Sequence, residues 1–163
     1  MRMFSKEKGE AILAPLTGKV VEISEVKSPI FAGKVVGDGI AIEPKSDDGI
    51  AKAPISGVVS FVVEQKHSFG ITGYDGIEIL IHIGIGTVAL NGEGFEPVVT
   101  KGQQVKAGDP LCRINWELIK EKGFDLTSPV IITSNSMSNV KRLTLREAWV
   151  QAGLSPCMEY VNK

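Results

Sequence analysis

Both histidines of this chain, His67 and His82, lie within one short stretch of the sequence. The segment around His82 is so apolar that a polar ring there needs a chemical reason. Imidazole titrates close to neutral pH, so it serves proteins as a general base, a nucleophile or a metal ligand. The two histidines are therefore the first candidates for a functional site.

The residues from Ile77 to Ile85 alternate strictly, with isoleucine at every second position. This period is typical of a β-strand that turns one face to the core, so we expect His82 on the opposite face. Residues 72–76, Thr-Gly-Tyr-Asp-Gly, have the composition of a hairpin loop. If Ile71 pairs near Ile77, His67 falls opposite His82 or within a residue or two, and the rings can touch. A slip of one residue would put them on opposite faces.

Two neighbouring imidazoles are compatible with several kinds of chemistry. They could bind zinc together with a carboxylate, although the HxxxH and CxxC spacings are absent. One could be the general base of a hydrolase, although GxSxG and HExxH are absent. One could be a nucleophile that holds a phosphoryl group, with the other ring hydrogen-bonded to the phosphate. Two partly buried rings satisfied by backbone groups are the fourth alternative, and the residues leave the choice open.

The composition limits the class of protein. The chain has 163 residues with a net charge of −1 and 23% charged residues, which argues against nucleic acid or an anionic membrane as the main partner. Residues 1–10 are polar and are expected to be a flexible N-terminal segment, followed by a single domain over residues 11–163. No signal peptide and no apolar run long enough for a membrane span is evident, so we predict a cytoplasmic protein.

The distribution of glycine, proline and β-branched residues favours strands joined by tight turns. The sequence has 18 glycines, 8 prolines and only 6% aromatic residues. A motif A-P-x-[ST]-G occurs at residues 14–18 and again at 53–57, each time before a β-branched run. This internal repeat suggests a duplicated β architecture.

The C-terminal part of the sequence is harder to assign. We predict one short helix over Trp116–Lys122, capped by Asn115 and ended by Gly123. We also expect strands around Ala148–Gln151 and Cys157–Val161 that pair with each other. The segment Lys141–Trp149 is locally ambiguous and is compatible with a helix.

Several segments resemble the glucose-type IIA components of the bacterial phosphoenolpyruvate-dependent sugar phosphotransferase system. EILIHIGIGTVALNGEGF (Glu78–Phe95) is similar to the phosphorylation-site signature of that family. The others are VGDGIAIEP, APISG, KHSFGI, GQQVKAGDPL and SPVIITS, and the matches follow the family order over about residues 11–134. The resemblance implies an all-β fold, an antiparallel β-sandwich or flattened barrel with a duplicated hybrid motif and one or two short helices.

The resemblance also implies a phosphotransferase activity. In this family the phosphocarrier protein HPr donates a phosphoryl group to a IIA histidine, and IIA passes it to a cysteine of a IIB domain during sugar uptake. It implies that His82 is the acceptor and that His67 supports the phosphate. It implies no cofactor, no metal and no direct contact with sugar, and contact with the membrane only through the permease.

A partner protein must cover the acceptor during such a transfer, because in-line geometry between two proteins needs a shallow apolar surface. The resemblance suggests that Asp38 lies at the docking rim. We add Phe31, Ile40 and Phe69 as candidates for the apolar part of this rim, with ordinary core packing as the alternative for each.

The sequence departs from the family pattern at two positions. Gly86 stands where the family usually has aspartate, and Gln65 where it commonly has threonine. We expect the Gln65 amide to replace the hydroxyl as a phosphate-supporting group. The departures motivate an alternative function, a phosphorylation-dependent regulatory binding module with reduced transfer. A zinc hydrolase on a similar β scaffold is a third hypothesis.

Overall fold

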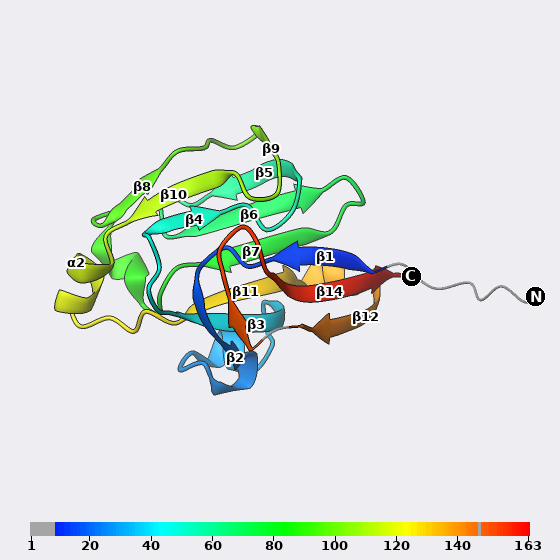
Figure 1. The fold of residues 1–163 in the computed structure, drawn as a ribbon, viewed down its shortest axis with the longest axis horizontal. Coiled ribbons are helices and arrows are strands. Elements are labelled where there is room, and N and C mark those ends of the chain that lie inside the picture. The colour runs from blue at the N-terminus through cyan, green and yellow to red at the C-terminus, as the bar shows by residue number, and fades with distance from the viewer. Residues whose placement is uncertain (1–8, 147) are drawn as a thin grey trace, which may run out of the picture.

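A computed structural model describes residues 9–146 and 148–163 (Figure 1). The protein is mostly β, with 45% strand and 14% helix, and the pairings between the described strands are antiparallel. The predicted all-β sandwich is therefore confirmed. Residues 1–8 of the predicted N-terminal segment lie outside the described residues, and the first strand already begins at Glu10.

The strands form three sheets. The 8-stranded sheet contains, in spatial order, β13 (Trp149–Val150), β2 (Gly18–Glu22), β3 (Gly37–Pro44), β11 (Ser128–Thr133), β7 (Glu78–His82), β6 (Ser68–Gly73), β5 (Gly57–Val62) and β9 (Gln104–Val105). The two 3-stranded sheets are β1 (Glu10–Leu13), β14 (Pro156–Asn162) and β12 (Val140–Leu145), and β4 (Ile50–Lys52), β10 (Pro110–Ile114) and β8 (Phe95–Pro97).

Short helices connect these strands. Three are α-helical, α1 (Pro29–Ala32), α2 (Trp116–Glu121) and α3 (Ser134–Met137), and two are 3-10 turns, η1 (Ile23–Glu25) and η2 (Thr87–Leu90). The helix predicted after Asn115 is α2, and the Asn115 side chain accepts a hydrogen bond from the Leu118 N–H at 3.1 Å. This contact satisfies a backbone donor of the first turn, as expected for an N-cap.

The repeated A-P-x-[ST]-G motifs pack against each other with matching hydrogen bonds. The Leu13 N–H, before the first motif, donates to the carbonyl of Pro54 at 2.9 Å. The Lys52 N–H, before the second motif, donates to the carbonyl of Pro15 at 3.0 Å. The two copies thus exchange equivalent bonds, which gives the centre of the fold a local two-fold pseudosymmetry.

The hydroxyls of the two motifs have equivalent partners as well. Thr17 Oγ1 accepts a hydrogen bond from the Ala152 N–H at 2.9 Å, and Ser56 Oγ accepts one from the Ala107 N–H at 3.0 Å. Both donors belong to an Ala-Gly turn that closes its half of the molecule. The Thr/Ser position of the motif therefore joins each copy to a distant turn, and the predicted duplication is confirmed.

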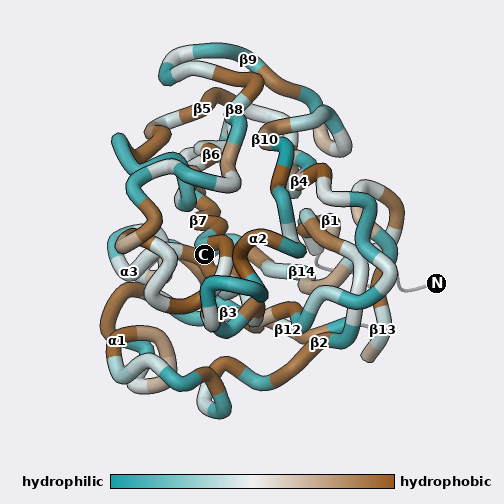
Figure 2. The backbone as a smooth tube through the Cα atoms, turned by 90° about the vertical axis from the view of Figure 1, so that its left-hand side faces the viewer, coloured by the Kyte–Doolittle hydropathy of each residue, from teal (hydrophilic) through white to brown (hydrophobic). Residues whose placement is uncertain are grey.

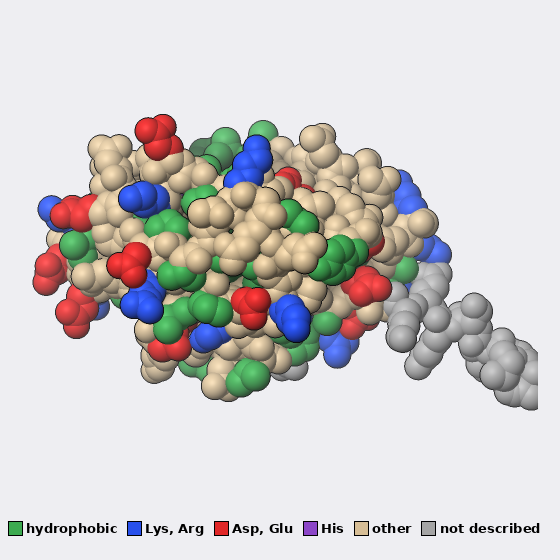
Figure 3. Space-filling model, turned by 90° about the horizontal axis from the view of Figure 1, so that it is seen from above, with side chains coloured by type: hydrophobic (Ala, Val, Ile, Leu, Met, Phe, Trp, Pro, Cys, Tyr) green, Lys and Arg blue, Asp and Glu red, His purple; other side chains and the backbone are tan. Residues whose placement is uncertain are grey.

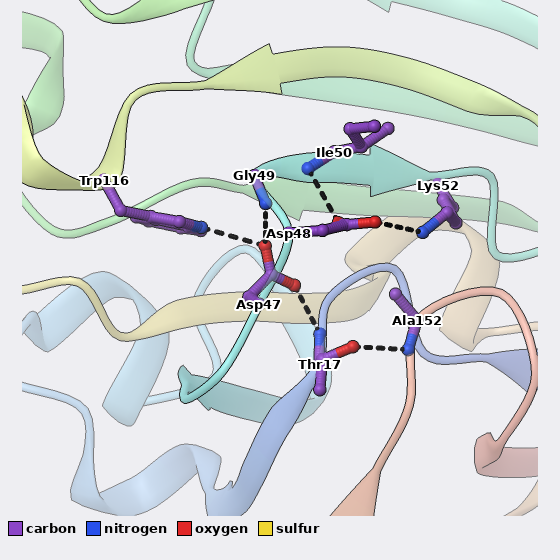
Figure 4. A network of polar contacts seen from close by, with 8 residues as sticks. All are labelled: Thr17, Asp47, Asp48, Gly49, Ile50, Lys52, Trp116 and Ala152. Carbon is purple, nitrogen blue, oxygen red and sulfur yellow. Dashed lines mark hydrogen bonds and ion pairs between the residues drawn. The ribbon is translucent and has the colours of Figure 1, made fainter.

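Asp47 links the first motif to other parts of the fold (Figure 4). Its carboxylate accepts hydrogen bonds from the Thr17 N–H at 2.6 Å, the Gly49 N–H at 2.8 Å and the Trp116 indole at 2.9 Å. The indole belongs to α2, so the Asp47 carboxylate joins the residues that directly precede β2 and β4 to α2.

One expectation for the C-terminal part was wrong, and one ambiguity is resolved. β13 pairs with β2, with Trp149 opposite Lys19, and not with β14. β14 lies between β1 and β12 instead. The ambiguous segment that starts at Lys141 forms β12 and not a helix, because an edge is available on β14 and long-range pairing outweighs a weak local preference.

The isoleucine face of β7 is core, as the alternation predicts. Ile77, Ile79, Ile81 and Ile83 are at most 1% exposed and belong to the main hydrophobic cluster, which also contains Phe69 of β6. Ile85 departs from this pattern and packs against a second cluster on the other side of the 8-stranded sheet, formed by Ile23, Val26, Phe31, Ala41 and Ile131. The alternation ends because β7 stops at His82 and Gly84 turns the chain with a φ of 74°.

The β6–β7 hairpin is anchored at its turn by Asp75. The Asp75 carboxylate accepts hydrogen bonds from the Tyr160 hydroxyl, from Asn162 Nδ2 at 3.2 Å and from the Ile77 N–H at 3.0 Å. Burial acts to raise the pKa of Asp75, but these hydrogen bonds outweigh it and hold the pKa below its usual value. The hairpin is thereby joined to β14 at one end, while both histidines lie at the other.

Replacing Tyr160 with phenylalanine should lower the free energy of unfolding by about 1 kcal/mol at neutral pH, since one hydrogen bond to a largely exposed carboxylate is lost. A carboxyl with a depressed pKa stabilises the fold above its unfolded pKa of about 3.9, and this contribution is lost as the pH falls through the folded pKa. The difference from wild type should therefore shrink in acid. Urea unfolding at pH 7 and pH 3 measures it.

Tyr74→Phe is the matched control, because Tyr74 precedes Asp75 and is 75% exposed. It should leave the stability unchanged at both pH values. Equal losses in the two variants, or a loss in Tyr160→Phe that does not depend on pH, would contradict the anchoring role of Asp75.

Candidate functional site

The rings of His67 and His82 are in contact. Their centroids lie 4.8 Å apart and their planes are almost perpendicular, at 85°. His82 ends β7, and His67 directly precedes β6. The rings thus come from the same end of one hairpin, as the sequence predicts.

The molecular face drawn in Figure 3 mixes acidic and basic side chains and shows no histidine.

The strand register differs by a small shift from the one expected. Ile71 pairs with Ile79 rather than near Ile77, and His82 is opposite Ser68. The rings nevertheless meet, because His67 lies outside the regular strand. Lys66 has a φ of 68°, and the chain turns there before β6 begins. The His67 carbonyl then accepts the Ile83 N–H at 2.8 Å, which holds this turn beside the end of β7.

The His82 ring is oriented by two neighbours. Phe31 of α1 contacts it edge-on, with a centroid distance of 5.0 Å. His82 Nδ1 lies 2.7 Å from the carbonyl oxygen of Gly84. A carbonyl oxygen only accepts hydrogen bonds, so Nδ1 must carry the proton. In the neutral ring Nε2 then holds the free lone pair, and the ring is partly exposed.

Both rings are neutral at physiological pH. The pKa of His82 is lowered to about 4. Burial is the main cause, the nearby His67 ring contributes in the same direction, and the hydrogen bond to the Gly84 carbonyl opposes the shift. Burial also lowers the pKa of His67, and the Gln65 backbone opposes it. A neutral imidazole with a fixed tautomer and an apolar neighbour is suited to act as a nucleophile.

His67 is less exposed to solvent than His82. His67 is only 6% exposed, and its Nδ1 makes no hydrogen bond of normal geometry within the described part of the chain. The Gln65 side chain, predicted to support the phosphate, therefore makes no hydrogen bond to this nitrogen. The Gln65 backbone acts on the ring by raising its pKa. An Nδ1 atom without a partner selects neither tautomer, and in the tautomer protonated on Nε2 the ring can donate a hydrogen bond to a ligand.

The predicted apolar rim needs correction. Phe31 is at the site, but Ile40 and Phe69 are 0% exposed and belong to the main core, so a partner cannot touch them. Their strands β3 and β6 are covered on the core face. Sequence alternation places such residues on a face, but it does not say which face of a two-layer sheet is covered.

Exposed apolar side chains occur on the elements that flank His82. Ile30 in α1 is 49% exposed, Val35 after α1 is 64% exposed, and Val88 in η2 is 49% exposed. Figure 2 shows the α1 segment as hydrophobic on the outside of the molecule. Sequence reasoning missed these residues, although their positions next to Phe31 and just beyond His82 were an available signal.

The expected rim has one carboxylate, Asp38, and a glycine, Gly86, where the family usually has a second one. Asp38 in β3 has a side chain that is 33% exposed and pairs with Lys34 at 3.6 Å. Gly86 has a φ of 77°, and a Cβ there would lie 3.6 Å from the Phe124 ring, which is ordinary contact. A side chain would therefore fit at residue 86 at the cost of an unfavourable backbone conformation.

The zinc-hydrolase hypothesis finds no support among the described residues. Over residues 9–146 and 148–163, no group of three histidine, cysteine or acidic side chains is placed to hold a metal ion. The hydrolase hypothesis therefore has no third ligand to offer there. In the same residues no helix is long and apolar enough to cross a membrane.

In an NMR pH titration we expect His82 to titrate near pH 4. His67→Gln should raise this pKa, because the repulsion from a second titrating ring is removed. The unfolded chain, with a histidine pKa of 6.5, binds more protons than the native protein between pH 6.5 and about 4. Stability should therefore fall as the pH falls through this window, and His82→Gln should weaken the fall. A His82 pKa near 6.5 would contradict the buried, neutral ring.

Known proteins resemble this chain over most of its length. The family model for the phosphoenolpyruvate-dependent sugar phosphotransferase system, EIIA 1, matches residues 10–138. The glucose-specific EIIA component of Bacillus cereus is 44% identical over 141 residues, which cover 86% of this chain and 84% of that protein. The glucoside-specific EIICBA component of Staphylococcus carnosus is 42% identical over 137 residues, which cover 84% of this chain and 20% of that protein.

A solved structure has the same architecture. The glucose permease IIA from Mycoplasma capricolum superimposes with a TM-score of 0.84 at 36% sequence identity, and the match covers 96% of this chain and 99% of that one. Sequence and structure thus agree over both halves of the duplicated fold. The chain belongs to the EIIA 1 family of the phosphoenolpyruvate-dependent sugar phosphotransferase system.

Proposed function

We propose that this protein is a cytoplasmic phosphocarrier that accepts a phosphoryl group from phospho-HPr on His82 and passes it to a cysteine of a IIB domain. One observation carries the proposal. His82 is a neutral ring whose Nδ1 proton is bound by the Gly84 carbonyl at 2.7 Å, so that Nε2 is the nucleophilic atom. A nucleophile prepared in this way beside a second imidazole is what transient storage of a phosphoryl group requires.

The transfer step follows from this geometry. The Nε2 lone pair of His82 attacks the phosphorus of phospho-HPr in line with the N–P bond of the donor. A new N–P bond forms on His82, and the electron pair of the old bond returns to the donor nitrogen. His82 keeps its Nδ1 proton, so its ring becomes positively charged as the bond forms. The Gly84 carbonyl stabilises this charge by accepting a stronger hydrogen bond.

His67 stabilises the phosphoryl group rather than accepting it. Its ring contacts His82 from the side, and in the tautomer protonated on Nε2 it donates a hydrogen bond to a phosphate oxygen. The deep burial of the ring lowers the local dielectric and strengthens a hydrogen bond to a phosphate oxygen. His67 thus stabilises the negative charge on the phosphate oxygens while the phosphoryl group is transferred to the IIB domain.

The partners approach an apolar surface near His82 formed by the exposed side chains of Ile30, Val35 and Val88, with Asp38 as the charged group at its edge. Both HPr and the IIB domain dock on this surface in turn. The names of the relatives suggest a glucose or glucoside system, and the fused EIICBA relative suggests that the IIB domain can belong to a larger permease.

His82→Gln should abolish phosphorylation by phosphoenolpyruvate, enzyme I and HPr. His67→Ala should still be phosphorylated, but onward transfer to a IIB domain should slow about 100-fold, since one phosphate hydrogen-bond donor is lost. Phosphoprotein gels and single-turnover kinetics measure the two steps. Phosphorylation of His82→Gln at the wild-type rate would refute the proposed acceptor.

Gly86 favours a second candidate function, a regulatory module that binds its partners with reduced transfer. With glycine here, the rim lacks a second carboxylate that could meet a basic partner surface. The rate of transfer from wild-type protein to IIB domains decides between efficient transfer and the regulatory function.

Gly86→Asp tests whether this carboxylate matters. The variant should bind HPr about two- to fivefold more tightly at low salt, and the gain should disappear at high salt. It should lose about 1 kcal/mol of stability because of the positive φ. Gly86→Asn is the matched control, with the same backbone strain and no charge. Equal affinities of the two variants would show that the missing charge is unimportant.

A further inference from the structure

The turn that follows His82 determines where the Gly84 carbonyl lies. Gly84 has a φ of 74°, a conformation that glycine adopts without strain. A Cβ at this position would lie only 2.6 Å from Thr87 Cγ2. The turn is therefore packed tightly against η2, and the carbonyl on which the His82 tautomer depends has little room to move.

Two fully buried hydroxyls hold the peptide group between Ile83 and Gly84. Thr87 Oγ1 donates to the Ile83 carbonyl at 2.5 Å, and the Gly84 N–H donates to Ser128 Oγ at 3.0 Å. Thr87 and Ser128 are both 0% exposed. One peptide unit is thus bound at its carbonyl and at its N–H by side chains from two different elements.

The hydroxyl of Ser128 is itself oriented. It donates to the Leu126 carbonyl at 2.8 Å, so its lone pair is free to accept the Gly84 N–H. Ser128 begins β11, which pairs directly with β7. The position of this hydroxyl relative to His82 is therefore set by the central strands of the 8-stranded sheet.

The next peptide group, between Gly84 and Ile85, carries the carbonyl that binds His82. Its N–H donates to the Asp125 carbonyl at 2.9 Å. This backbone bond alone leaves the Gly84 dihedral angles free on one side. The grip on the preceding peptide group by Ser128 and Thr87 removes that freedom.

We propose that Ser128 and Thr87 are positioning residues for phosphoryl acceptance: they hold the Gly84 carbonyl at His82 Nδ1, and so keep the proton on Nδ1 and the lone pair on Nε2. This inference rests on the proposed function of His82. If the carbonyl moves away, either nitrogen of the neutral ring can carry the proton. A ring protonated on Nε2 has its lone pair on Nδ1, so Nε2 can no longer attack phosphorus.

The positioning role also affects the charge that develops during transfer. The new N–P bond leaves a positive ring with its proton on Nδ1, and a carbonyl held in place stabilises this charge without first having to reorient. Groups that orient a metal-binding histidine typically contribute about 10- to 100-fold in affinity or activity, and we expect the same range for groups that orient His82. The two hydroxyls act on His82 through one peptide group.

A purely structural role is the competing explanation, because buried backbone groups need hydrogen-bond partners in any protein. Ser136 provides the comparison. Its buried hydroxyl accepts the Glu78 N–H at 2.9 Å, at the opposite end of β7. Ser128→Ala and Ser136→Ala therefore remove the same kind of bond, one from the turn after β7 and one from the first residue of β7, but only Ser128 holds the turn that binds His82.

The experiment compares Ser128→Ala, Thr87→Val and Thr87→Ser with Ser136→Ala and wild type. Nitrogen-15 NMR of the His82 ring in unphosphorylated protein reports which nitrogen carries the proton. Stopped reactions with phospho-HPr, at limiting and at saturating concentration, give the rate of acceptance. Urea unfolding shows that each variant is folded and how much stability it has lost.

We expect mixed tautomers and an acceptance rate at saturation about 10-fold below wild type in Ser128→Ala and Thr87→Val. Thr87→Ser should restore both readouts because it keeps the hydroxyl. Ser136→Ala should lose stability but keep the wild-type tautomer and rate. Unchanged tautomers and rates in Ser128→Ala and Thr87→Val, or an equal loss of rate in Ser136→Ala, would overturn the proposal.

The two proposals fail in different ways. If wild-type protein takes no phosphoryl group on His82, the proposed function is wrong, whatever the variants do. If wild type is phosphorylated and the variants are phosphorylated equally fast, only the positioning role is wrong. The tautomer measurement needs no partner protein, so it tests the link from Ser128 and Thr87 to His82 in either case.

Discussion

The hydrogen bond from His82 Nδ1 to the Gly84 carbonyl is the contact on which the proposed chemistry of this site depends. It leaves the free lone pair of the neutral ring on Nε2, and it does so with a backbone group that cannot itself titrate. Burial and the neighbouring His67 keep the ring neutral, while the carbonyl remains ready to stabilise a positive charge. An isolated histidine in water would have neither property, since its tautomers interconvert and its pKa lies near neutrality.

The rest of the fold can be understood as support for that contact. The isoleucine face of β7 locks one side of the strand into the main core, so that the other side is presented with little freedom. The duplicated motifs tie the two halves of the molecule together through equivalent bonds at Pro15 and Pro54. Thr87 of η2 and Ser128 of β11 hold the turn at Gly84. Phe31 packs against an edge of the His82 ring.

Local patterns predicted those parts of the structure that depend on local physics. The alternation around His82, the cap at Asn115 and the repeated motif each have a short-range cause, and each appears in the structure. Ile40 and Phe69 were misplaced because a periodic pattern shows that a residue is on a face but not what covers it. The partner of β13 was wrong because strand pairing is a long-range choice. The hydroxyls of Ser128 and Thr87 lie far apart along the chain from each other, so nothing local indicated that they hold one peptide group.

The anchoring of the hairpin turn at Tyr160 has a geometric consequence for tethering. Glu10 pairs with Tyr160, so the first and last described strands run side by side, next to Asp75 and its turn. His82 lies at the other end of the same hairpin. A covalent linker joined near β1 or β14 would therefore leave the molecule at the pole opposite the histidines. A chain with this fold could therefore be joined to a further domain at that pole and still turn both histidines away from the linker.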